Sequence, residues 1–165
     1  MSRPAELQIL MDRHFALRRA TVDDAALISR QRHDMFADMG HTDIEAATEK
    51  FTEWVRPKLA NGEYVGWIVS HHNKEVVAGA GLWLIEWPPT PLDLHTQRGY
   101  VLNVFVREDV RRQGLARWLV TTILDYCQAH GIRVILLHAS EKGRSLYESL
   151  GFTTTTEMRL VYPRA

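Results

Sequence analysis

The stretch that decides the fold is Val104-Phe105-Val106-Arg107-Glu108-Asp109-Val110-Arg111-Arg112-Gln113-Gly114-Leu115-Ala116-Arg117, where a predicted strand turns into a predicted helix. Gly114 and Ala116 are small, so backbone N–H groups at this turn can approach a ligand closely. The first N–H groups of a helix lack intrahelical partners, and with the helix dipole they favour a bound anion. Arg111, Arg112 and Arg117 add forked donors that suit phosphate oxygens. The stretch predicts a pyrophosphate site, although a capped helix with solvated arginines would use the same residues.

The surrounding pattern predicts two parallel strands joined by this helix. Apolar residues recur at positions 115, 119, 120, 123, 124 and 127, one face of a helix that Gly131 ends. Residues 100–106 before it and 132–139 after it resemble buried strands, and a right-handed crossover makes them parallel. The chain contains neither Gly-x-x-x-x-Gly-Lys-[Ser/Thr] nor Gly-x-Gly-x-x-Gly, which argues against the usual nucleoside triphosphate and dinucleotide sites.

The rest of the chain predicts further strands and helices around this unit. A strand at 15–18 precedes a helix that starts at a Thr21/Asp24 capping box and stops at Gly40, and a second helix starts at Thr42. Pro57 should end or kink that second helix. We also expect a hairpin of strands 64–70 and 76–86, a loop at 87–94, a helix at 143–150 and a last strand at 158–162. The fold class is mixed α/β: a mostly antiparallel twisted sheet of six to seven strands with about four helices.

Composition limits the class of protein. The 165 residues fit one domain, 1–165, in which 1–13 is expected to be a loosely ordered N-terminal extension. Basic and acidic residues number 20 each, which gives no argument for a nucleic-acid partner. The single cysteine, Cys127, excludes an intramolecular disulfide, and no apolar run approaches the ~18 residues of a membrane span, so we expect a cytoplasmic protein without a membrane partner.

Two motifs together resemble the GCN5-related N-acetyltransferase (GNAT) family. Arg111–Ala116 fits its acetyl-CoA signature, [Arg/Gln]-x-x-Gly-x-[Gly/Ala], and Leu146-Tyr147-Glu148-Ser149-Leu150-Gly151-Phe152 fits its Leu-Tyr-x-x-x-Gly-Phe block. The resemblance implies that the parallel strands splay apart and that the pantetheine arm of acetyl-CoA pairs with the backbone of one of them. The cofactor-binding residues it implies are Val104, Phe105, Val106, Arg111, Arg112, Gln113, Gly114, Leu115, Ala116, Arg117 and Ser140. Glu108 and Ser140 depart from the family, which often has Pro and Asn there.

The same resemblance implies transfer of an acetyl group to a primary amine in a ternary complex. Tyr147 is then the general acid that protonates the departing thiolate, since phenol has a pKa of about 10 and a thiol about 8.5. A main-chain N–H near Phe105 or Val106 would stabilise the oxyanion. The general base stays open among Glu86, Asp93, His95, His138 and water.

Several alternatives remain at this point. The acceptor is a small-molecule amine or a protein amine, and Trp83, Trp87 and the proline-rich loop are candidates for the wall of its pocket. The eight histidines show no metal-binding spacing, so no metal is expected. A module that senses acyl-CoA without turning it over is the competing function, and the sequence leaves a homodimer open.

Overall fold

The computed structural model describes residues 14–164, and the expected extension at 1–13 lies outside them. These residues form one five-stranded sheet and four α-helices. The strands are β1 (Phe15–Arg19), β2 (Tyr64–His71), β3 (Val76–Glu86), β4 (Gln97–Val106) and β5 (Ile135–Leu137), and the helices are α2 (Ala25–Asp38), α3 (Glu45–Asn61), α4 (Leu115–Ala129) and α5 (Glu141–Ser149). Short 3₁₀ turns, Val22–Asp24 and Glu108–Val110, precede α2 and α4.

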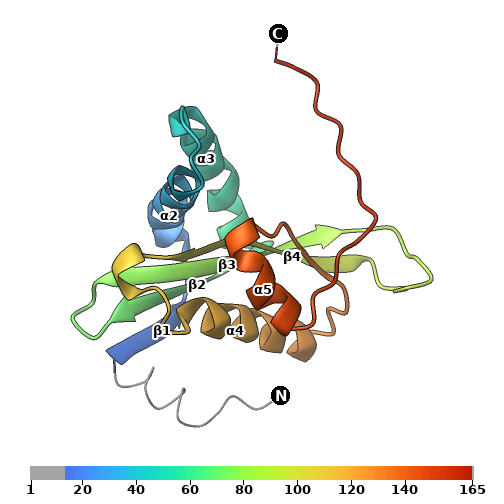
Figure 1. Cartoon of the computed structure of the whole chain (residues 1–165). Helices are drawn as coiled ribbons and strands as arrows, with labels where there is room; N and C mark the ends of the chain where they lie inside the picture. Colours follow the sequence, from blue (N-terminus) through green and yellow to red (C-terminus); the bar gives the residue numbers. More distant parts are fainter. Residues whose placement is uncertain (1–13, 165) are drawn as a thin grey trace.

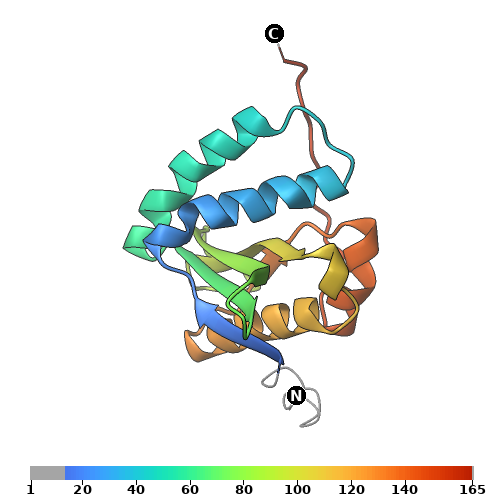
Figure 2. The ribbon, with the colours of Figure 1, turned by 90° about the vertical axis from the view of Figure 1, so that its left-hand side faces the viewer.

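The strand order is β1-β2-β3-β4-β5, antiparallel except for the last pair. The α/β class and the parallel pair flanking α4 are therefore confirmed. Helices α2 and α3 cover one face of the sheet and α4 the other, as Figures 1 and 2 show. The buried face of α4 consists of Leu115, Trp118, Leu119, Val120, Ile123 and Cys127. This packing fixes both ends of α4 against the sheet, so the turn before Leu115 has a defined position.

Three predictions about elements are wrong. The sheet has five strands where six to seven were expected, because residues 158–162 form no strand and are exposed. The strand expected at 132–139 is reduced to β5, since its partner β4 diverges beyond Val101. Pro57 does not end its helix: α3 continues to Asn61 and ends at Gly62, whose φ of 82° is the left-handed conformation that glycine adopts readily.

Candidate active site

The parallel pair opens near its middle. Only Gly99, Tyr100 and Val101 of β4 pair with β5, while β4 itself continues to Val106. Its register with β3 also shifts between Gly79 and Gly81, a β-bulge that increases local twist. Asn103 lies within this bulge and has a positive φ of 57°. Backbone groups of residues 102–106 that point towards β5 therefore have no strand partner and can pair with an extended ligand.

The turn between β4 and α4 presents backbone donors. Arg112 and Gly114 both have left-handed φ values, 64° and 83°, which turn the chain sharply into the helix. Within residues 14–164, no carbonyl accepts a hydrogen bond from the N–H groups of residues 115–117. Three N–H groups at the positive end of a 15-residue helix suit a phosphate, so the donor chemistry of this turn fits the pyrophosphate of acetyl-CoA.

The three arginines of the turn have different partners. Arg111 donates from Nε to the Val106 carbonyl at 2.9 Å and pairs with Asp38 at the end of α2. Arg117 donates from Nη2 to Ser149 Oγ of α5 at 2.6 Å. Arg112 is exposed, and its side chain has no hydrogen bond or ion pair with any described residue. Of the three guanidinium groups, that of Arg112 can reach a phosphate without giving up a protein partner.

One cavity of about 1200 Å³ joins these features. Its lining includes every residue predicted from the cofactor and acid motifs except Gln113: Val104, Phe105, Val106, Arg111, Arg112, Gly114, Leu115, Ala116, Arg117, Ser140 and Tyr147. Residues that sequence reasoning did not single out also line it, among them Arg32, Met35, Phe36, Phe51, Trp54 and Asn103. The cavity thus runs from the cradle at α4 to a largely aromatic region beneath α2 and α3.

Tyr147 projects from α5 into this cavity. Its ring crosses Phe152 nearly edge-on, with centroids 5.9 Å apart, and a Cβ on Gly143 would lie 3.1 Å from it. Burial raises the pKa of Tyr147, so its phenol stays protonated at neutral pH. Ser140 caps the same helix, accepting a hydrogen bond from the Gly143 N–H at 3.2 Å. The cap and the small Gly143 together position the tyrosine.

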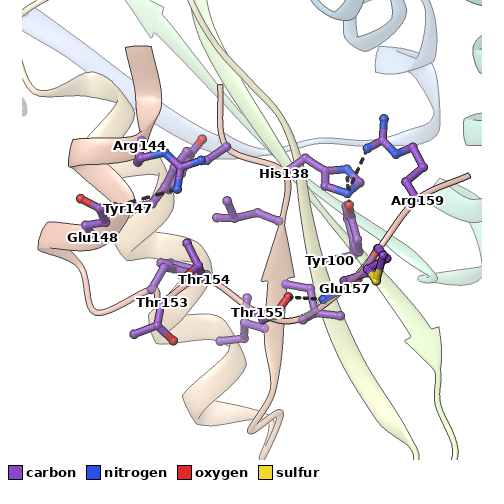
Figure 3. A pocket seen from close by; sticks show the side chains of 16 residues that line it. Tyr100, His138, Arg144, Tyr147, Glu148, Thr153, Thr154, Thr155, Glu157 and Arg159 are labelled. Carbon is purple, nitrogen blue, oxygen red and sulfur yellow. Dashed lines mark hydrogen bonds and ion pairs between the residues drawn. The ribbon is translucent and has the colours of Figure 1, made fainter. Parts of the chain in front are cut away.

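The four side chains considered as general base differ in whether they line the cavity. His138 lines the cavity, and its Nδ1 lies 2.7 Å from Tyr100 Oη (Figure 3). Glu86, Asp93 and His95 are absent from its lining. The buried Asp93 lies 3.0 Å from His95 Nδ1 and 3.6 Å from Arg133, and its hydrogen bonds with His95 lower the pKa of Asp93.

Of the two tryptophans expected beside an acceptor, only Trp83 lines the cavity. Trp87 lies instead under the guanidinium of Arg98, whose central carbon is 4.6 Å from the centroid of the Trp87 ring. The proline-rich loop supplies no lining residue either. Helices α2 and α3 line this part of the cavity, α2 with Phe36 and α3 with Phe51 and Trp54. Phe51 packs against Trp54, which in turn crosses Trp83 and Tyr64 edge-on.

A polar cluster beneath the aromatic region was missed from the sequence. Arg32 donates to Asn103 Oδ1 at 2.6 Å, and Asn103 Nδ2 donates to Tyr64 Oη at 2.9 Å. The guanidinium of Arg32 lies 4.7 Å from the ring centroids of both Phe36 and Phe51. Burial raises the pKa of Tyr64 to about 12 and lowers that of Arg32. The one signal in the sequence was an asparagine inside the apolar run Val101–Val106.

Comparison with known proteins agrees with this geometry. Residues 27–152 match the family model described as Acetyltransferase (GNAT) family. A GCN5-related N-acetyltransferase from Ralstonia eutropha JMP134 is 35% identical with a TM-score of 0.85, covering 90% of this chain and 98% of that one. A predicted acetyltransferase from Clostridium acetobutylicum, solved with acetyl-CoA, is 27% identical with a TM-score of 0.84, covering 90% and 96%. The chain belongs to the GNAT family of N-acetyltransferases.

A curated relative matches over a shorter stretch. The [ribosomal protein bS18]-alanine N-acetyltransferase of Escherichia coli K12 is 35% identical over 66 residues, 38% of this chain and 45% of that protein. The match thus spans less than half of the relative's length. Between residues 14 and 164, no helix is long and apolar enough to cross a membrane, and no three His, Cys, Asp or Glu side chains are grouped to hold a metal ion.

Proposed function

We propose that this protein transfers the acetyl group of acetyl-CoA to a primary amine. The observation that carries the proposal is the single cavity that joins the unpaired N–H groups at the head of α4 to the Tyr147 phenol. Acetyl-CoA, when bound, supplies the activated acetyl group. The backbone of residues 115–117 and Arg112 would hold its pyrophosphate, and the open edge of β4 would pair with the amides of its pantetheine arm.

Tyr147 acts as the general acid in this proposal. Its burial keeps the phenol neutral, so the proton is available when negative charge develops on the sulfur. A backbone N–H at Phe105 or Val106, on the open side of β4, would donate to the carbonyl oxygen as charge develops there. For the base, His138 or a water beside it is preferred over Glu86, Asp93 and His95, because His138 alone of these lines the cavity.

The acceptor amine would enter on the side of α2 and α3. The rings of Phe51, Trp54 and Trp83 line this region, and Arg32 contributes the positive charge there. The E. coli relative acts on an alanine of a ribosomal protein, which supports a protein amine as one acceptor class, beside small-molecule amines. An acceptor whose amine lies near a carboxylate suits the region best, since no carboxylate among the described residues pairs with Arg32.

The test is thiol release from acetyl-CoA with a panel of amines and amino-terminal peptides. Tyr147→Phe should lower kcat by roughly 10²–10⁴ while the Kd for acetyl-CoA stays within about twofold. Tyr126→Phe is the matched control, because Tyr126 stacks on His130 and does not line the cavity. An unchanged kcat in Tyr147→Phe would remove this residue from the chemistry. Thermal stabilisation by acetyl-CoA without thiol release on any amine would instead favour the acyl-CoA sensor.

A further inference from the structure

The acceptor side of the large cavity holds a cation without an anion. The half-buried guanidinium of Arg32 donates from Nη1 to Asn103 Oδ1, while its Nε and Nη2 donate to no described residue. It lies over the rings of Phe36 and Phe51, which give it no charged partner. Burial lowers the pKa of Arg32, because the cation has lost water and gained no carboxylate. The free side of the guanidinium fork has the geometry that binds a carboxylate through two hydrogen bonds.

The charges on the cavity lining argue against acceptors that carry several amines. Among residues 14–164, one carboxylate lines the cavity, that of Asp38, and it is paired with Arg111. The cations of the lining are Arg32, Arg111, Arg112, Arg117 and Lys142. A polyamine or an aminosugar with several ammonium groups would bring more positive charge to this lining, with no free carboxylate to offset it. The lining favours an acceptor that carries a negative charge beside its amine.

Apolar side chains lie beside Arg32 on the face of the sheet that α2 and α3 cover (Figure 2). Met35 and Met39 of α2 line the cavity together with Trp54 of α3 and Trp83 of β3. Trp54 crosses Trp83 nearly edge-on, with centroids 5.2 Å apart, and both rings are half-buried. Rings that face a cavity in this way are stabilised when a ligand covers them with apolar surface. The acceptor should therefore combine its carboxylate with a large apolar side chain.

The position of Arg32 along β4 suits an amine that lies next to its carboxylate. Arg32 is hydrogen-bonded to Asn103, and Phe105 follows Asn103 by two residues, about 7 Å along a strand. In an α-amino acid the nitrogen lies about 2.5 Å from the carboxylate carbon. With contacts of about 3 Å at either end, such a molecule spans roughly the interval from Arg32 to the open edge of β4 at Phe105. An amine at the end of a lysine-length side chain would lie about 5 Å farther from its carboxylate.

On the basis of the proposed acetyl transfer, we propose that the acceptor is a free α-amino acid with a large apolar side chain. Its carboxylate binds Nε and Nη2 of Arg32, and its side chain packs against Trp54 and Trp83. Its α-amine then faces the open edge of β4. The product is the N-acetyl amino acid: the C–N bond forms as the C–S bond breaks, the amine loses a proton to the base, and the sulfur takes the proton of Tyr147.

The amino terminus of a polypeptide is the competing acceptor. Its first residue carries a neutral amide in place of the carboxylate, so Arg32 would stay without a charged partner in the complex. An amino acid and its amide differ by this group alone, so comparing them measures the contribution of Arg32 directly.

Thiol release from acetyl-CoA with four acceptors tests the carboxylate: phenylalanine, its amide, glycine, and an amidated tripeptide that begins with phenylalanine. The ratio of the amide's KM to that of phenylalanine should be about tenfold higher in the wild type than in Arg32→Met, whose ratio gives the baseline for the different reactivity of the two amines. Arg30→Met is the matched control, because Arg30 lies on the same helix, is 74% exposed and does not line the cavity. It should keep the wild-type ratio. Equal ratios in the wild type and Arg32→Met, or a lower KM for the tripeptide than for phenylalanine, overturn the proposal.

The apolar side chain is tested with glycine as acceptor. KM for glycine should exceed KM for phenylalanine at least about tenfold in the wild type. Trp54→Leu should reduce this ratio at least about threefold, whereas Trp87→Leu should leave it unchanged, since Trp87 does not line the cavity. Equal KM values for glycine and phenylalanine in the wild type contradict a side-chain pocket.

Calorimetric titration of phenylalanine into the protein saturated with coenzyme A measures binding without turnover. The Kd should rise about tenfold in Arg32→Met. An acetyl-CoA affinity within about twofold of wild type shows that the variant is folded. Binding that needs Arg32, without thiol release on any amine, would support the amino acid site and refute acetyl transfer. Thiol release that is equally efficient with and without a carboxylate would support acetyl transfer and overturn the amino acid proposal.

Discussion

Replacing the two glycines at opposite ends of α4 tests the anion cradle against a matched control. Gly114 and Gly131 have φ values of 83° and 69°, so alanine at either position pays a similar backbone penalty, roughly 1–2 kcal/mol. A Cβ on Gly131 would meet no atom within 4 Å, so its cost is that of the backbone alone. For a chain of 165 residues, the penalty lowers the Tm by about 2–8 °C in each variant.

Only Gly114→Ala should also weaken acetyl-CoA binding. The left-handed turn at Gly114 aims the N–H groups of residues 115–117 outward, whereas Gly131 lies about 25 Å away along the helix. A hydrogen bond to a charged group contributes about 1.5–3 kcal/mol, so misplacing one donor should raise the Kd roughly 10- to 150-fold. Calorimetric titration with acetyl-CoA measures this, beside thermal melts of both variants. Equal Kd values for the two variants would refute the cradle at Gly114.

Three other substitutions test the remaining features. Arg32→Met should raise KM about tenfold for amines that carry a carboxylate and leave KM for neutral amines within about twofold, measured by thiol release. Gly81→Ala should cost about 1–3 kcal/mol in denaturant unfolding, because the new Cβ would lie 1.9 Å from Tyr64 Oη; an unchanged free energy of unfolding would contradict the close approach. Asp24→Asn should cost about 1.5–3 kcal/mol at pH 7, since Asp24 accepts hydrogen bonds from Arg18 and the Thr21 N–H. These contacts lower the pKa of Asp24 in the folded protein. The stability that they contribute is therefore present above the unfolded pKa near 3.9 and is lost as pH falls through the lower folded pKa. The difference in free energy of unfolding between variant and wild type should persist at pH 5 and shrink below about pH 4.

Local patterns were sufficient to predict most of the fold and to propose one half of the candidate site. The strand-turn-helix at Gly114 lies within one short stretch that predicts the anion cradle, and the strand-helix-strand pattern of residues 100–139 predicts the parallel pair. The Leu-Tyr-x-x-x-Gly-Phe block indicates Tyr147 through its resemblance to the GNAT family. The preference of proline to end a helix made Pro57 a candidate end of its helix. Helix α3 nevertheless continues past Pro57, because tertiary packing outweighs this local preference.

The acceptor half could not be read from the sequence for a different reason. Arg32, Tyr64 and Asn103 come from three separate elements, and only the packing of α2 over the sheet brings them into hydrogen-bonding distance. Likewise, the strand propensity of residues 158–162 predicted a last strand, whereas these residues pair with no strand of the sheet. Properties that depend on which distant segments meet are not encoded in any single window of residues.

No residue between Arg133 and Arg164 is buried, and this affects the affinity that a titration with acetyl-CoA would measure. Residues 133–164 form a layer that buries little side-chain surface. This layer should unfold locally at a lower free energy than the β1–β4 part of the sheet, which would stay intact. Tyr147 belongs to that layer, and so does Ser149, the partner of Arg117. Acetyl-CoA bound as proposed would have to hold these residues closed, so its apparent affinity would equal the intrinsic affinity scaled by the closed fraction.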